Sequence, residues 1–336
     1  MKLSPMSLAS LAIVLLATPI ATAAVLADGV SFAVEEGTEL TRTFEARGEY
    51  ELKSAALILD GERVRESEDV EMTIDSLERI VVTDELDEIE DGRPTDLTRT
   101  FVELVQESTD ATEDEEYESS SSSDLEGLSV RFLWDEDDES YYAEAVDDDD
   151  DLEDDVLAWL AGDMDFLEYL PDGEVSEGDE WDLDASAYLA IMWPGGLLGF
   201  YDDGDVEIDP FNVAVDRQVV ENLTGSGTAT LEELRDEDGE SVAVISIELD
   251  VETWALEDRE VEGGEVTYDI EINREIEGEL VWNLDRGRLD TATFDAVAGM
   301  VRTVSWTAET EDGDIDVEQE ERYEGTIAYE VEFEEE

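Results

Sequence analysis

Cysteine and histidine are both absent from the 336-residue sequence. Without histidine, the chain has no Ser-His-Asp or Cys-His nucleophile system and no imidazole ligand for zinc. Without cysteine, it has no disulfide, no thiolate ligand and no cysteine that could carry a lipid. Glycine-rich phosphate loops of the GxxxxGK[ST] and GxGxxG types are missing as well. The sequence therefore excludes most familiar hydrolase mechanisms, and we assign no catalytic residue, no cofactor and no metal ligand.

Positive charge is also scarce, with 18 Lys and Arg residues against 99 Asp and Glu residues and a formal net charge of -81. Such a surface repels nucleic-acid phosphates and anionic membranes. Lys53 is the only lysine after Lys2, and this composition is typical of proteins adapted to high salt. Because counterions must screen the carboxylates, we expect folding to depend on salt and counterion binding to be weak.

Long hydrophobic runs are missing beyond the first residues, where Leu8 to Ala17 follow Lys2 and precede the small residues Ala21 to Ala23. This pattern predicts a signal peptide over residues 1–23. No later segment approaches the roughly 20 apolar residues of a transmembrane helix. We expect an exported, soluble protein, periplasmic or extracellular, with no lipid anchor and no transmembrane segment.

Apolar and polar side chains alternate through most of the remaining sequence, most clearly from Val242 to Phe333. When apolar residues alternate with acids, successive side chains of a strand point to opposite faces of the sheet. This pattern predicts strands with one buried face and one solvent-exposed face. Short turns between them, such as Asp285 to Gly287, favour an antiparallel meander. We therefore predict a mainly β (α+β) fold, a large curved antiparallel sheet or half-barrel with a few covering helices. Residues 24–336 are expected to form a single domain, and two sub-halves meeting near 170–185 remain an open alternative.

The N-terminal part adds a hairpin from Gly29 to Arg65 with its turn at Asp60-Gly61, and strands near 97–105 and 128–134. Met72 to Val82 fits either a helix or a strand. The segment EDEEYESSSSSD, residues 113–124, is acidic and serine-rich, which predicts an exposed, disordered loop.

The densest acidic run is DDDDDLEDDVLAWL, Asp147 to Leu160. Apolar residues after it recur at spacings of three and four, which predicts a helix over 152–170 that covers one face of the sheet. Aspartates at its N-terminus would face the positive end of the helix dipole. Neither this run nor DEDDE and DEDGE has the ligand spacing of an EF-hand, so a solvated face is favoured over a calcium site.

The most apolar stretch after the signal peptide is ASAYLAIMWPGGLLGFY, Ala185 to Tyr201, and Pro194 rules out one continuous helix there. Two interpretations remain open for its apolar side chains. They either fill the core, which is the commoner outcome, or line an apolar ligand pocket. The candidate pocket residues are Trp193, Leu197, Leu198, Phe200 and Tyr201.

The segment LPDGEVSEGDEW, Leu170 to Trp181, resembles the LP-x3-V-x2-GD-x-W signature of a family of secreted or lipid-anchored, planctomycete-like bacterial proteins with a domain of unknown function. IEDGRPTDLTRTF and GELVWNLDRGRL are similar to other parts of such proteins. The resemblance implies a curved antiparallel sheet with a few helices, and it brings no activity and no catalytic residue. Read physically, Gly178 permits a turn and Trp181 begins a strand with its ring in the core.

The leading hypothesis is an exported, non-catalytic envelope or extracellular protein that binds an unknown small molecule or an envelope partner in the concavity of its sheet. One alternative is a carboxylate-based hydrolase such as a glycosidase, for which acids are abundant but no pair stands out. Another is a multivalent cation binder, supported by charge density alone.

Overall fold

The computed structural model describes residues 25–26, 29–67, 72–112, 115–138, 140–146, 152, 154–202, 210–237, 239–261, 264–310 and 313–335. The predicted signal peptide over 1–23 and the aspartates at 147–151 lie outside the described residues. No helix in the described ranges is both long enough and apolar enough to cross a membrane.

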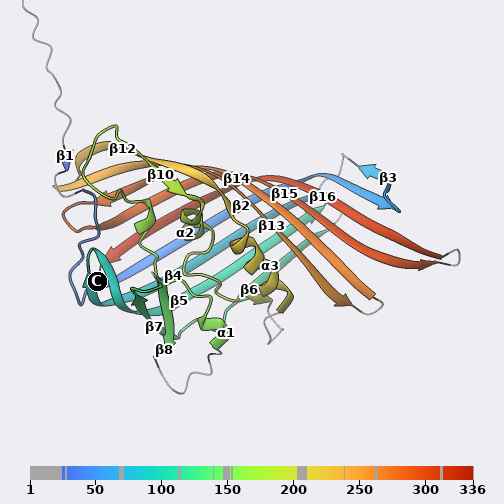
Figure 1. Ribbon diagram of the computed structural model, residues 1–336, viewed down its shortest axis with the longest axis horizontal. Coiled ribbons are helices and arrows are strands. Elements are labelled where there is room, and N and C mark those ends of the chain that lie inside the picture. The colour runs from blue at the N-terminus through green and yellow to red at the C-terminus, as the bar shows by residue number, and fades with distance from the viewer. Residues whose placement is uncertain are drawn as a thin grey trace, which may run out of the picture.

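A large antiparallel sheet that does not close on itself forms most of the molecule (Figure 1), which confirms the predicted fold class. In the described chain its central strands are β12 (Thr224–Glu237), β13 (Glu240–Val261), β14 (Gly264–Asn283), β15 (Arg288–Thr310), β16 (Gly313–Glu335), β2 (Glu39–Leu59), β4 (Met72–Glu90) and β5 (Arg93–Thr112), hydrogen-bonded in that order. The edges carry β10 (Glu180–Asp184) beside β12, and β6 (Glu116–Ser122) with β11 (Tyr201–Asp202) beyond β5. β3 (Glu62–Ser67) pairs with β2, and β7 (Ser129–Asp135) links β5 to β8 (Ser140–Ala145). A separate pair joins β1 (Val25–Leu26) to β9 (Val175–Ser176).

Cross-strand register explains how the alternating sequence builds one apolar face. Successive antiparallel partners lie on the same face of a sheet. One row across six strands consists entirely of buried apolar residues, namely Leu280, Ala292, Val331, Phe44, Ile80 and Leu104 on β14, β15, β16, β2, β4 and β5. Glu279, Glu330 and Glu45 belong to the adjacent row, which lies on the opposite face.

Tight turns fix this register, one of them at the predicted Asp60-Gly61. Asp60-Gly61 joins β2 to β3, and Asp91-Gly92 joins β4 to β5. Both residues of each turn have positive φ, from 49° to 78°, as the two-residue turns that match strand twist require. Met72 to Val82, which fitted either element in the sequence, is strand.

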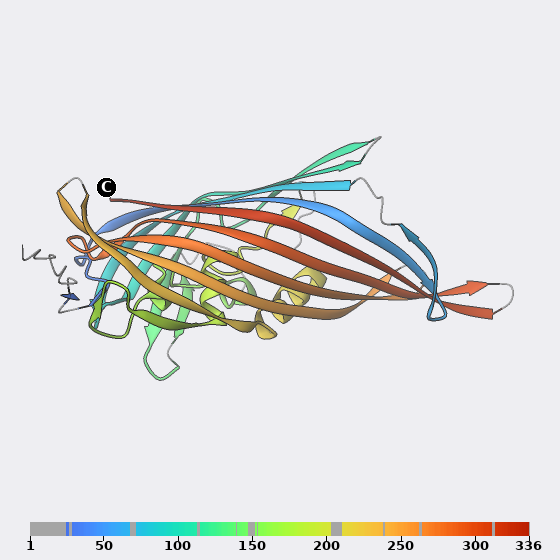
Figure 2. The same ribbon diagram turned by 90° about the horizontal axis from the view of Figure 1, so that it is seen from above.

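The concave face is covered by a polypeptide layer that we call the cover, the described residues of 154–200 (Figure 2). It contains α1 (Asp154–Leu157), the 3₁₀ turns η1 (Leu167–Tyr169) and η2 (Ala185–Tyr188), and α2 (Leu189–Met192). The predicted helix over 152–170 is therefore wrong, because α1 ends at Leu157 and irregular chain follows it. The prediction that this segment lies over the sheet is correct, since Leu160, Met164 and Phe166 belong to the core.

The predicted disordered loop at 113–124 is wrong over most of its length, because Glu116–Ser122 forms β6. β6 pairs residue by residue with the end of β5, from Gln106↔Ser121 to Ala111↔Glu116. Backbone groups form these hydrogen bonds, so any segment without proline can pair at this edge, whatever its side chains. Composition alone had indicated disorder, but a neighbouring strand supplies the pairing.

A longer helix, α3 (Pro210–Glu221), lies along β13 where β12 no longer pairs with it. Amide side chains of α3 and of the residue that follows it form hydrogen bonds with the strand backbone. Gln218 donates to the carbonyl of Leu256 and accepts from its N–H, both at 3.0 Å. Asn222 donates to the carbonyl of Trp254.

The LPDGEVSEGDEW segment behaves as its residue types predict. Gly178 has a φ of 86°, and the carboxylate of Asp179 accepts from the N–H of Ser176 at 2.8 Å. Trp181 lies in β10, packs against the core and donates from its indole N–H to the carbonyl of Tyr169.

Candidate binding site in the cover

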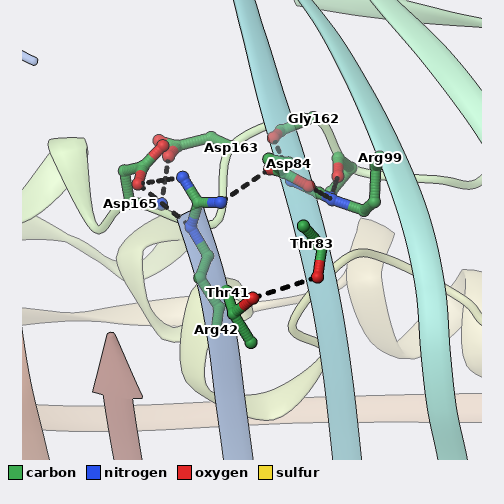
Figure 3. A network of polar contacts seen from close by, with 9 residues as sticks. Thr41, Arg42, Thr83, Asp84, Arg99, Gly162, Asp163 and Asp165 are labelled. Carbon is green, nitrogen blue, oxygen red and sulfur yellow. Dashed lines mark hydrogen bonds and ion pairs between the residues drawn. The ribbon is translucent and has the colours of Figure 1, made fainter. Parts of the chain in front are cut away.

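Two arginines that project from the sheet hold the cover in place (Figure 3). Arg42 on β2 donates through Nε and Nη2 to Oδ1 of Asp165, at 3.1 and 2.5 Å. Arg99 on β5 donates to the carbonyls of Ala161 and Gly162, at 2.8 and 2.9 Å. Asp84 on β4 lies between the arginines, bound by Arg99 through both oxygens and 2.9 Å from Arg42 Nη1.

All three sheet residues of this network have fully buried side chains. Buried charges are tolerated when they are paired and hydrogen-bonded, and a single missing partner is costly. Arg99 also satisfies two cover carbonyls that a helix would have bonded internally. The network therefore explains why the chain after α1 is irregular and yet fixed.

Phe166 follows directly and fits the cover into the sheet. Its ring stacks on Phe44 at 6.2 Å and on Phe294 at 5.9 Å between centroids. Its φ is 57°, a left-handed conformation that is unusual for a bulky residue. Such strain persists only where the surroundings enforce it, and here Asp165 and the two aromatic partners do so.

A crevice of about 250 Å³ opens in the cover beside this network. Half-buried or buried apolar side chains from the cover and from α3 form most of its wall: Trp159, Phe166, Leu189, Trp193, Leu197 and Val220. The polar groups in the wall belong to Asp163, Glu168 and Ser186. An apolar cavity with a few polar groups is the usual form of a small-ligand site.

The structure brings together two of the five residues proposed from the sequence, Trp193 and Leu197, in the wall of this crevice. Leu198 is buried instead, and its carbonyl accepts a hydrogen bond from Ser123. Phe200 packs against the core. The side chain of Tyr201 lies outside the described part, although its backbone pairs with Ser122.

Asp163 is a polar group of the crevice wall whose pKa is shifted from its ordinary value. Burial, and then the charge of Asp165, raises its pKa to about 6. Its Oδ1 accepts from the backbone N–H of Asp165 at 2.8 Å, and no side chain in the described ranges donates to it. The crevice wall therefore holds a carboxyl group with a raised pKa, and beside it Glu168 accepts a hydrogen bond from Ser186 at 3.2 Å.

Sequence reasoning did not identify Trp159, Asp163, Arg42 or Arg99. A signal for the arginines was present, because Arg42 occupies an inward position in a strand and the chain has few basic residues. Nothing comparable distinguished Asp163 among so many acids. Within the described ranges, no group of three or more acids is arranged to hold a metal ion, and DDDDD at 147–151 lies outside those ranges.

Comparisons with known proteins add little to this geometry. No family model matches the chain, and no curated protein matches its sequence. The resemblance of LPDGEVSEGDEW to a bacterial family therefore stays a prediction. Among solved structures, the chain is similar to the V. cholerae type IV competence pilus secretin PilQ, with a TM-score of 0.15 and 8% identity over 88% of this chain. It spans 60% of that protein, and a likeness at this level supports neither a shared fold nor a shared function.

Proposed function

We propose that this protein is an exported, non-catalytic binding protein that takes a small, largely apolar ligand into the crevice between Trp159 and Trp193. The crevice itself carries the proposal, because apolar side chains from two separate segments leave about 250 Å³ unfilled. The absence of histidine and cysteine and the signal-peptide pattern support a non-catalytic role outside the cytoplasm.

Volume limits the ligand. An apolar cavity of about 150 Å³ accepts benzene, so a crevice of this size suits a two-ring aromatic group or a short branched chain. The indole rings of Trp159 and Trp193 offer flat contact surfaces to such a group. Ser186 and the two carboxyl groups provide the hydrogen-bonding partners that orient a ligand.

Fluorescence titration with the neutral naphthalene fluorophore Prodan, in molar NaCl, tests the proposal. We expect saturable 1:1 binding to the wild type and about tenfold weaker binding to Trp193→Ala, a loss of about 1.4 kcal/mol of aromatic contact. Trp254→Ala is the matched control, because Trp254 is 49% exposed and is not among the crevice residues.

Two results would contradict the proposal. One is the absence of saturable binding to the folded wild type, as judged by circular dichroism in the same buffer. The other is equal binding by the Trp193 and Trp254 variants, which would place the fluorophore elsewhere on the surface.

A further inference from the structure

A second polar cluster lies between the cover and the sheet, around Arg274 on β14. Four arginines are buried within the described chain: Arg42, Arg99, Arg274 and Arg288. Three of them have a carboxylate oxygen within 4 Å. Arg274 has none in the described chain, although acids outnumber basic residues by 99 to 18 in the sequence. A buried cation without a counter-ion is costly, so this exception calls for a physical reason.

Neutral groups bind part of the Arg274 guanidinium. Nη1 donates to the carbonyls of Asn273 and Gly299, at 2.9 and 3.3 Å, and Nη2 donates to the Tyr50 hydroxyl at 3.2 Å. Arg274 is 7% exposed, and its Nε has no hydrogen-bond partner among the described residues.

Tyr188 of the cover supplies a second unused donor. It is 1% exposed, and Arg274 and the Tyr329 hydroxyl are close enough to act on its pKa, which burial raises. Its hydroxyl nevertheless makes no hydrogen bond of acceptable geometry to any described residue. The Arg274 cluster therefore holds one cationic and one neutral donor, Arg274 Nε and the Tyr188 hydroxyl, both buried and neither in a hydrogen bond of acceptable geometry with a described residue.

The sheet is built to bring these groups together. Arg274, Ala298, Gly325 and Tyr50 are successive cross-strand partners on β14, β15, β16 and β2. Because Ala298 and Gly325 are small, Arg274 and Tyr50 meet across the two strands between them. A Cβ on Gly325 would lie 2.7 Å from the Tyr50 ring, so a larger residue would displace it.

The surface next to the cluster is apolar and only partly covered. Two residues along β14 and β15 from the Arg274–Ala298 pair, on the same concave face, lie Ile272 and Met300. They pair with each other, and both are half-buried. Beyond them, Tyr268 lies against Phe211 of α3, with ring centroids 4.8 Å apart. Figure 2 shows β14, β15, β16 and β2 running on past the cover at this end.

We infer that the Arg274 cluster binds the carboxylate head of a single-chain amphiphile whose tail lies over Ile272 and Met300. The two oxygens of a carboxylate match the two unused donors, Arg274 Nε and the Tyr188 hydroxyl, and its single negative charge supplies the missing counter-ion. The site is separate from the Trp159–Trp193 crevice, and neither proposal depends on the other.

Isothermal titration of the full-length protein with decanoate, and with 1-decanol as the uncharged homologue, tests the inference in molar NaCl. We expect decanoate to bind at 1:1 stoichiometry, and Arg274→Gln to bind it at least about tenfold more weakly, because charged hydrogen bonds are lost. Decanol binding should be the same in the wild type and in Arg274→Gln. Arg302→Gln is the matched control, because Arg302 lies on the same face of β15 but is paired with Glu321 at 2.5 Å.

A second variant keeps the test independent of folding in Arg274→Gln. Tyr188→Phe removes only a hydroxyl that makes no hydrogen bond of acceptable geometry with a described residue. The fold should therefore persist while decanoate binds several-fold more weakly and raises the melting temperature less. Equal decanoate affinity in the wild type, Arg274→Gln and Tyr188→Phe would overturn the inference. So would equal or tighter binding of decanol than of decanoate by the wild type, since the head group would then contribute nothing.

Discussion

Replacing Asp163 with asparagine should stabilise the protein at neutral pH and change little in acid. Burial beside Asp165 raises the pKa of Asp163 from 3.8 to about 6. A carboxyl group whose pKa is raised by folding favours the folded state only while it is protonated. Its contribution is therefore fully present below the unfolded pKa, and it is lost as the pH rises through about 6.

The size of the effect follows from the shift. Two pKa units correspond to about 3 kcal/mol at full burial. Asp163 is only partly buried, so solvent screening reduces the expected gain to about 1–2 kcal/mol. Asparagine keeps the oxygen that accepts the 2.8 Å hydrogen bond from Asp165, so the local geometry should survive. The stability difference between variant and wild type should grow between about pH 4 and about pH 6 and then stay constant.

Urea unfolding at fixed molar NaCl, followed by circular dichroism from about pH 4 to about pH 7.5, measures this difference. Asp172→Asn, an exposed acid in the same segment, is the control and should show no comparable gain. The reasoning is refuted if Asp163→Asn is no more stable than the wild type at neutral pH. A gain of the same size at every pH would also refute it, because titration would then not be the cause.

Three further predictions concern the cover and the charge. Arg99→Met leaves Asp84 and two cover carbonyls short of donors, so the free energy of unfolding should fall by about 3 kcal/mol or more in urea titrations, and a loss under about 1 kcal/mol would contradict the proposed role. Gly162→Ala should lower the free energy of unfolding by about 1–3 kcal/mol in the same titrations, because a Cβ there would overlap the Tyr141 ring. A variant as stable as the wild type would contradict this, since the cover would then have moved to make room. The melting temperature should rise from dilute buffer to molar NaCl as counterions screen the net charge of -81, and an unchanged value would contradict adaptation to salt.

Local sequence patterns predicted the sheet because its determinants are local. Asp60-Gly61 and Asp285 to Gly287 fix turns between strands whose alternation is visible in the sequence itself. The chain after Leu157 could not be predicted in this way. Its apolar spacing fits a helix, but Arg42 and Arg99, far earlier in the sequence, bind Asp165 and the carbonyls of Ala161 and Gly162.

The same distinction applies to the candidate sites. Trp193 and Leu197 stood out because their segment is unusually apolar, and they do line the crevice. Leu198, from the same segment, is buried, because which side chain faces the crevice depends on the turn at Pro194 and Gly195. Arg274 gave no signal at all, since the sequence does not show that a basic residue lacks a carboxylate neighbour.

The amide contacts between α3 and β13 affect how separate molecules meet. A strand edge with free N–H and C=O groups can add a strand from another chain, and high salt weakens the charge repulsion that would keep such chains apart. Gln218 and Asn222 occupy part of that edge with uncharged groups, whose hydrogen bonds do not depend on ionic strength. Part of the β13 edge is therefore closed to strand addition by contacts that remain when salt screens the acidic coat.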